Sequence, residues 1–118
     1  MSDEGVPFDV VSDQLDGMAV VTVSGEIDLT TSDSLQGSIE RTTSPTVVLD
    51  LSRVSFLDSS GIRAIDRGRR RLASEGRSFR IVSPPGTPSA WTLRVAGFDR
   101  DLVVESLDRV RDANSQTA

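Results

Sequence analysis

The stretch VVLDLSRVSFLDSSGIRAIDRGRRRL, residues 47–72, decides how this chain folds. It begins in a short continuous apolar run, TVVLDLS at 46–52, which is typical of a strand buried in the middle of a sheet. It ends in a helical pattern, because Ile62, Ile65 and Leu72 mark one side of a 3.6-residue repeat. Between the two lies FLDSSG, at 56–61. The sequence therefore predicts a strand that passes directly into a helix at the DSSG residues.

The residues before this stretch predict two strands and a helix. FDVVSDQLDGMAVVTVSGEID, residues 8–28, contains a DG pair at Asp16–Gly17, a strong signal for a hairpin turn between strands. A helix is expected next in DLTTSDSLQGSIE, where a Thr or Ser among residues 30–32 can cap the first turn. Leu35 and Ile39 are four residues apart and are expected to face the core.

The residues after it continue the alternation. The expected elements are a strand at SFRIVS (78–83), a helix at TPSAWTLRVAG (87–97), a short strand at LVVE (102–105) and a terminal helix at SLDRVRDA (106–113). In the first of these helices, Trp91 and Val95 have the i, i+4 spacing of one apolar face. The whole order, ββαβαβαβα, predicts an α/β fold with a single mixed β-sheet and helices packed against it. The ends, MSDEG and DANSQTA, are small and polar and are expected to be loose.

Composition excludes several kinds of site. The chain has 118 residues, a length that suits one domain with one core. It contains no cysteine and no histidine, so a disulfide framework, a Ser-His-Asp triad and the usual zinc sites cannot be built from it. Every basic residue is arginine, so no Schiff-base lysine and no phosphate-loop lysine is present. We expect no cofactor, no metal and no enzymatic activity, although Asp28 and Asp58 could converge as paired carboxylates.

Charge and hydropathy argue against nucleic acid and membranes as partners. The net charge is −5, and residues 1–62 carry eleven acidic residues against two arginines, which does not suit a nucleic-acid-binding domain. No apolar run approaches the ~20 residues that span a bilayer. The acidic start, MSDEGVPFDV, lacks the layout of a signal peptide. The expected location is the cytoplasm.

A basic block interrupts this pattern at residues 63–80, with seven arginines against two acidic residues. Arg63, Arg67, Arg70 and Arg71 share the helix face that lies away from the apolar stripe, which is ordinarily the solvated side. We interpret the block as exposed surface. The alternative is an interface with an acidic partner, which would be sensitive to salt and weakened by Arg67→Glu.

The FLDSSG junction is the candidate functional site. In open α/β sheets, ligands and partners bind beyond the carboxyl ends of strands, near helix N-termini. A single side chain is enough to cap the helix; Ser59 or Ser60 could do so, and Asp58 could do it alone. Gly61 lets the chain pack closely at the turn. Two adjacent hydroxyls exceed what a cap needs, which leaves one of them available for another role.

Three motifs in the chain resemble the STAS domain of bacterial anti-anti-sigma factors, which are anti-sigma factor antagonists. They are GEID at 25–28, VVLDLSRVSFLDSSGI at 47–62 and VAGFDRDLVV at 95–104. The resemblance runs from about Phe8 to Arg111. It implies a single STAS domain over residues 1–118, with the STAS fold and a core at about 8–111.

The resemblance also implies a phosphorylation switch. In that family a partner kinase, which is also the anti-sigma factor, phosphorylates the first serine of DSSG; here that residue is Ser59. We then expect Ser60 to be the residue that caps the helix. The implied partner-binding residues are Asp28, Asp58, Ser59, Ser60, Gly61 and Arg63. The unphosphorylated form would bind the anti-sigma factor serine kinase and indirectly release a sigma factor. Phosphorylation would abolish that binding, and a phosphatase would restore it. Several arginines interrupt the family's apolar pattern in the following helix, which leaves the identity of the partner open.

A scaffold role is the alternative function, because it shares the fold. STAS domains also assemble in stress-signalling complexes and assist lipid-transport ABC systems as accessory subunits. A stable large oligomer, or co-purification with a membrane ATPase, would favour that role. The complete DSSG motif at 58–61 favours the switch.

Overall fold

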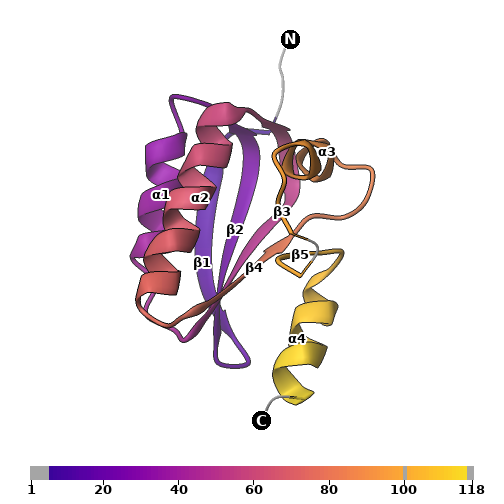
Figure 1. Cartoon of the computed structure of the whole chain (residues 1–118). Coiled ribbons are helices and arrows are strands. Elements are labelled where there is room, and N and C mark those ends of the chain that lie inside the picture. The colour runs from indigo at the N-terminus through magenta and orange to yellow at the C-terminus, as the bar shows by residue number, and fades with distance from the viewer. Residues whose placement is uncertain (1–5, 100, 117–118) are drawn as a thin grey trace.

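The structure is a computed structural model that describes residues 6–99 and 101–116 (Figure 1). Its elements are β1 (Asp9–Leu15), β2 (Met18–Ile27), α1 (Ser32–Glu40), β3 (Thr46–Leu57), α2 (Ser59–Ser74), β4 (Ser78–Val82), α3 (Pro88–Val95), β5 (Val103–Val104) and α4 (Leu107–Gln116). This confirms the predicted order ββαβαβαβα and the α/β class. Within the described part of the chain, no helix combines the length and the apolar composition needed to cross a membrane.

The two chain ends differ from each other. MSDEG, at 1–5, lies outside the described residues. Most of DANSQTA, at 112–118, belongs to α4, which continues to Gln116. The terminal helix predicted at 106–113 is therefore confirmed and continues past its apolar residues to Gln116, while the looseness of the chain ends stays a prediction.

The sheet is mixed, as predicted, with the strand order β1-β2-β3-β4-β5. β1 and β2 are antiparallel, and the other neighbouring pairs are parallel. The turn between β1 and β2 has positive φ at both central residues, 53° at Asp16 and 79° at Gly17. Two consecutive residues of this kind make a turn whose twist matches that of a hairpin, which explains the DG pair in the sequence.

Helices cover both faces of the sheet and bury its central strand. α1 and α2 lie side by side against one face (Figure 1). Val47 and Leu49 of β3 belong to the core on that side, together with Leu72 of α2. The intervening Val48 belongs to a second cluster, which Val110 of α4 completes on the opposite face. Because side chains alternate along a strand, burial on both faces produces the continuous apolar run seen in the sequence.

The last part of β3 extends beyond β4. β4 pairs with β3 only along residues 46–50, whereas β2 pairs with β3 to its end. α3 packs against β3, at the upper right of Figure 1. Its buried residues are Ser89 and Leu93, while Trp91 and Val95 are 60% and 64% exposed. The helix is confirmed, but the apolar face formed by Trp91 and Val95 does not pack on the sheet, because α3 turns its Leu93 side toward the core.

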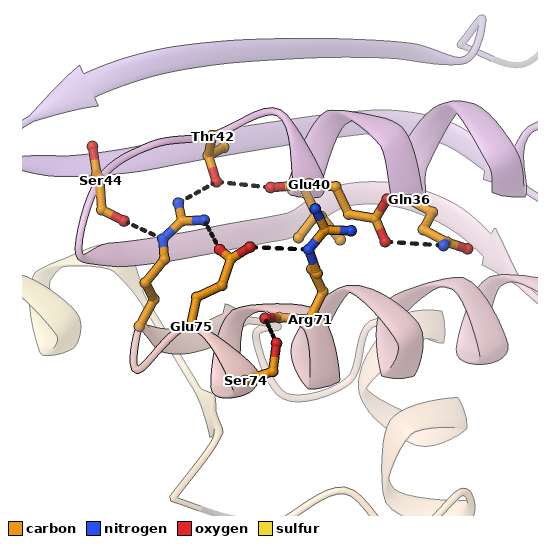
Figure 2. Close-up of polar contacts among 9 residues, drawn as sticks. Gln36, Glu40, Thr42, Ser44, Arg71, Ser74 and Glu75 are labelled. Atoms are coloured by element: carbon orange, nitrogen blue, oxygen red, sulfur yellow. Dashed lines mark hydrogen bonds and ion pairs between the residues drawn. The ribbon is translucent and has the colours of Figure 1, made fainter.

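Polar contacts join the segments that follow α1 and α2 (Figure 2). The guanidinium of Arg77, whose side chain is 13% exposed, donates to the Ser44 carbonyl at 2.9 Å, to Thr42 Oγ1 at 2.8 Å and to Glu75 Oε1 at 2.9 Å. Arg71 Nε donates to the other oxygen of Glu75, also at 2.9 Å. These hydrogen bonds hold the pKa of Glu75 below its ordinary value, with the bond from Arg71 as the largest cause. They tie the C-terminal end of α2 to the loop that leads into β3.

Candidate functional site

Two acidic residues follow the paired ends of β2 and β3. These strands are parallel, and their last paired residues are Ile27 and Leu57. Asp28 directly follows β2 and Asp58 directly follows β3. The backbone NH of Asp58 donates to the Ile27 carbonyl at 3.2 Å. The structure therefore brings the GEID and DSSG motifs together at one edge of the sheet, as the carboxyl ends of neighbouring parallel strands require.

Asp58 caps helix α2. Its backbone is extended, with φ −107° and ψ −172°, and its Oδ1 accepts hydrogen bonds from the backbone NH groups of Ser60 at 2.9 Å and Gly61 at 3.2 Å. The prediction that Ser60 caps the helix is wrong. A cap must precede the first helical residue, and the helix begins at Ser59, so Ser60 already lies inside the first turn.

The two serines differ in exposure. Ser59 is exposed and Ser60 is half-buried. Within residues 6–99 and 101–116, neither hydroxyl takes part in a hydrogen bond, because the cap is supplied by Asp58. Ser59 thus presents an unengaged hydroxyl on the first turn of a capped helix, which is the geometry that a modifying enzyme or a binding partner can reach.

Gly61 allows α2 to start directly against the strand ends. It is buried, and a Cβ atom added there would lie 2.7 Å from Ile27 Cγ2 and in still closer contact with Leu57 Cδ1. Any larger residue would have to push the helix away from β2 and β3, or displace two core side chains. The expectation of close packing at this glycine is confirmed, and this packing sets the position of Ser59.

Asp28 is held in a compact turn before α1. Its Oδ1 accepts from Thr30 Oγ1 at 2.6 Å and from the Thr30 backbone NH at 2.9 Å, and its own NH donates to Thr31 Oγ1 at 3.0 Å. The Thr30 hydroxyl, followed by its NH, holds the pKa of Asp28 below the ordinary value for an aspartate. Thr31 is the N-cap residue of α1, within the predicted range, but its side chain bonds back to this turn rather than to the helix.

Three surface hollows surround the junction. One of about 100 Å³ lies between α1 and α2 and includes Ser60, Arg63 and Arg67. A second, of about 360 Å³, lies between α2 and the end of α3. Its lining residues are Ser59, Ile62, Arg63, Asp66, Ala96 and Phe98. The third, of about 330 Å³, includes Glu26 and Asp28.

Arg63 is the predicted site residue that joins two of these hollows, since it lines both the first and the second. Ala96 and Phe98 belong to the site region but were not singled out from the sequence as site residues. They lie 37 and 39 positions after Ser59, and the packing of α3 against β3 brings them to the hollow that α2 also lines. Within the described residues, no group of three or more Asp and Glu side chains could hold a metal ion.

Comparison with known proteins identifies the fold family. The family model for the STAS domain matches residues 9–113. The crystal structure of an anti-sigma factor antagonist from Mycobacterium paratuberculosis is 28% identical, with a TM-score of 0.83 over 93% of this chain and 97% of that one. A comparison with curated proteins gives no significant match.

Two more distant structures have the same fold. The phosphorylated form of the Bacillus cell fate determinant SpoIIAA is 18% identical, with a TM-score of 0.64 over 91% of this chain and 98% of that one. A sulfate transporter family protein from Wolinella succinogenes is also 18% identical, with a TM-score of 0.68 over 80% and 81% of the two chains. The sheet order, the capped DSSG helix and the family match over residues 9–113 lead to one conclusion: this chain belongs to the STAS domain family.

Proposed function

We propose that this chain is an anti-sigma factor antagonist that is switched by phosphorylation of Ser59. The observation that carries the proposal is the exposed Ser59 hydroxyl, which has no hydrogen bond within the described residues, on a helix start fixed by Asp58 and Gly61. The similarity to the antagonist from M. paratuberculosis, over nearly the full length of both chains, supports it. The proposal gives the chain no catalytic step of its own and places its action in the cytoplasm.

The unmodified protein would bind an anti-sigma factor that is also a serine kinase. Ser59, Ser60 and Arg63 are the side chains of this surface that face the hollows, while Asp58 and Gly61 shape the backbone beneath them. Asp28 would fix the neighbouring turn at the edge of the same surface. Binding of the anti-sigma factor would release the sigma factor that it otherwise holds.

Phosphorylation would end this binding. In the transfer from ATP, the Ser59 hydroxyl oxygen forms the new P–O bond, the bond between the β- and γ-phosphates breaks, and ADP and the hydroxyl proton leave. A neutral hydroxyl is replaced by about −1.5 to −2 charges at pH 7. The first turn of a helix tolerates negative charge, so the fold is expected to persist. A partner surface that fits a small neutral serine then meets both charge and bulk, and a phosphatase would reverse the change.

Substitution of Ser59 tests the switch. A tagged Ser59→Ala protein, expressed in the source cells, should retain a small ATP-binding kinase, and calorimetry then gives its affinity for the purified partner. Ser59→Ala should bind as tightly as the unmodified wild-type protein, and Ser59→Asp should bind much more weakly. Ser12→Asp, at an exposed serine of β1 outside the proposed surface, is the matched control and should leave binding unchanged. Equal affinity of Ser59→Ala and Ser59→Asp would contradict the mechanism, and capture of a membrane ATPase or a large assembly would favour the scaffold role.

A further inference from the structure

The arginines of α2 are not equivalent in charge pairing. Arg69 and Arg70 both pair with Asp66, at 2.7 Å and 2.9 Å, and Arg71 pairs with Glu75 at 2.9 Å. The other two, Arg63 and Arg67, are exposed and have no ion pair within residues 6–99 and 101–116. Two cations near the functional end of the helix are therefore available to an added negative charge.

Arg63 is the one of these two that shares a hollow with Ser59. It lies four residues after Ser59 in the same helix, the spacing at which side chains meet on one helix face. Both residues line the 360 Å³ hollow between α2 and the end of α3. Arg67 lies two turns from Ser59 and lines the smaller hollow on the α1 side instead. Ser59 and Arg63 thus bring a hydroxyl and a cation, one helical turn apart, to the lining of the same hollow.

Among the described residues, Asp33 lines the smaller hollow together with Arg63 but forms no ion pair with it, and the carboxylates nearest Ser59 already have partners. Asp66 lines the same hollow, but its two oxygens are already paired with Arg69 and Arg70. The carboxylate of Asp58 accepts the helix NH groups of Ser60 and Gly61. Within the part of the chain that the structure describes, the α3 side of the hollow contributes Ala96 and Phe98, which carry no charge.

We propose that Arg63 is the intramolecular charge partner of a phosphate on Ser59, and that the pair closes the hollow lined by Ile62, Ala96 and Phe98 to a partner protein. This inference rests on the proposed phosphorylation of Ser59. A guanidinium matches a phosphate geometrically, because its planar fork donates two parallel hydrogen bonds. The switch then works by filling this hollow with the phosphate–guanidinium pair, in which one guanidinium offsets only part of the phosphate charge, so that bulk and residual negative charge both meet the partner.

A phosphate titration tests the pair. Phosphoserine is placed at position 59 during translation with an expanded genetic code, so no kinase is needed, and ³¹P NMR follows its second ionisation. Free phosphoserine has a second pKa of about 6, and a neighbouring cation lowers it by favouring the dianion. An exposed ion pair of ordinary strength corresponds to a shift of roughly 0.2–0.7 pH unit. The second pKa should therefore rise by that amount in Arg63→Gln.

Two further variants make the result specific. Arg63→Lys keeps a charge and should restore most of the lowered pKa, while Arg67→Gln is the matched control and should leave it unchanged. Asp58 and Asp66 are present in every variant, so their effect cancels in the comparison. An identical titration of wild type and Arg63→Gln would overturn the proposal, and so would an equal shift in Arg67→Gln, which would indicate only a general positive field. Circular dichroism of each phosphoprotein checks that the exposed substitutions leave the fold intact.

This outcome is separate from that of the proposed function. If the titration shows no Arg63 effect but phosphoserine still blocks the anti-sigma factor, the switch stands without the pair. If the pair forms but phosphoserine at position 59 leaves binding of the partner unchanged, the proposed function fails while the charge pairing holds.

Discussion

Gly61→Ala tests how closely the first turn of α2 packs against the ends of β2 and β3. The added methyl group would lie 2.7 Å from Ile27 Cγ2 and 3.3 Å from Ile27 Cβ, and closer still to Leu57 Cδ1. Ile27 and Leu57 are buried, with 0% and 4% exposure, so neither side chain has open space to move into. The start of α2 must then shift outward, or the two side chains must leave their preferred rotamers.

The expected magnitude follows from two opposing effects. Forcing an extra carbon into a packed core costs about 1–3 kcal/mol. Replacing glycine by alanine inside a helix contributes up to about 1 kcal/mol, and less in the first turn, where the backbone is less constrained. The net change for Gly61→Ala is therefore a loss of about 1–2 kcal/mol. For a domain of this size, that lowers the melting temperature by several degrees.

Gly37→Ala provides the matched control. Gly37 lies in α1, and a Cβ atom added there would approach only the guanidinium of Arg41, whose Nη1 lies at 2.9 Å and can swing into solvent. Gly37→Ala should therefore stabilise the protein, by up to about 1 kcal/mol. Urea unfolding followed by circular dichroism at 222 nm measures both variants. A Gly61→Ala protein at least as stable as wild type would refute the packing argument, whatever Gly37→Ala does.

Three further predictions concern the cap, the acidic turn and the polar network. Asp58→Ala should destabilise the protein by about 0.5–2 kcal/mol, because it removes the cap of α2. Ser60→Ala should change the free energy of unfolding by less than about 0.5 kcal/mol. If urea unfolding shows the larger loss for Ser60→Ala, the helix is capped by Ser60 and the assignment to Asp58 is wrong. The folded-state pKa of Asp28 is lowered, so its ionised form stabilises the fold above about pH 4 and this contribution is lost as the pH falls through the lowered pKa. The gap in stability between wild type and Asp28→Asn should therefore be present at pH 6.5 and should narrow as the pH falls below about 4, and a gap that does not depend on pH would contradict this. Arg77→Ala should cost about 1–3 kcal/mol, because it leaves the Ser44 carbonyl and the Thr42 hydroxyl without their donor, and thermal unfolding should show a smaller loss for Arg71→Ala, whose side chain is 56% exposed.

The elements of the fold were predictable because their signals are local. The hairpin turn requires two consecutive residues with positive φ, and the Asp16–Gly17 pair supplies them. The apolar run of β3 reflects burial on both faces of the sheet. The junction at 58–61 could be located for the same reason, since a strand signal stops where a helix signal starts. Even so, the sequence did not decide which residue caps the helix. Asp58 and Ser60 are both good caps in isolation, and only the position of the first helical residue separates them.

Other features depend on contacts between distant parts of the chain. The i, i+4 spacing of Trp91 and Val95 indicates a helix face, but it cannot show that Leu93 is the residue that packs on the core. Likewise, the spacing of Arg63 places it on the solvated side of α2. The spacing does not reveal that Phe98 and Ser59 line the same hollow, because their proximity depends on how α3 packs against β3.

The most direct test of the central claim is to map phosphate on the protein isolated from its own cells, by mass spectrometry, and to record which proteins accompany each form. The proposed switch predicts phosphate on Ser59 and a small ATP-binding kinase bound only to the unmodified form. Absence of phosphate under every growth condition, with a membrane or scaffold partner in place of a kinase, would contradict it.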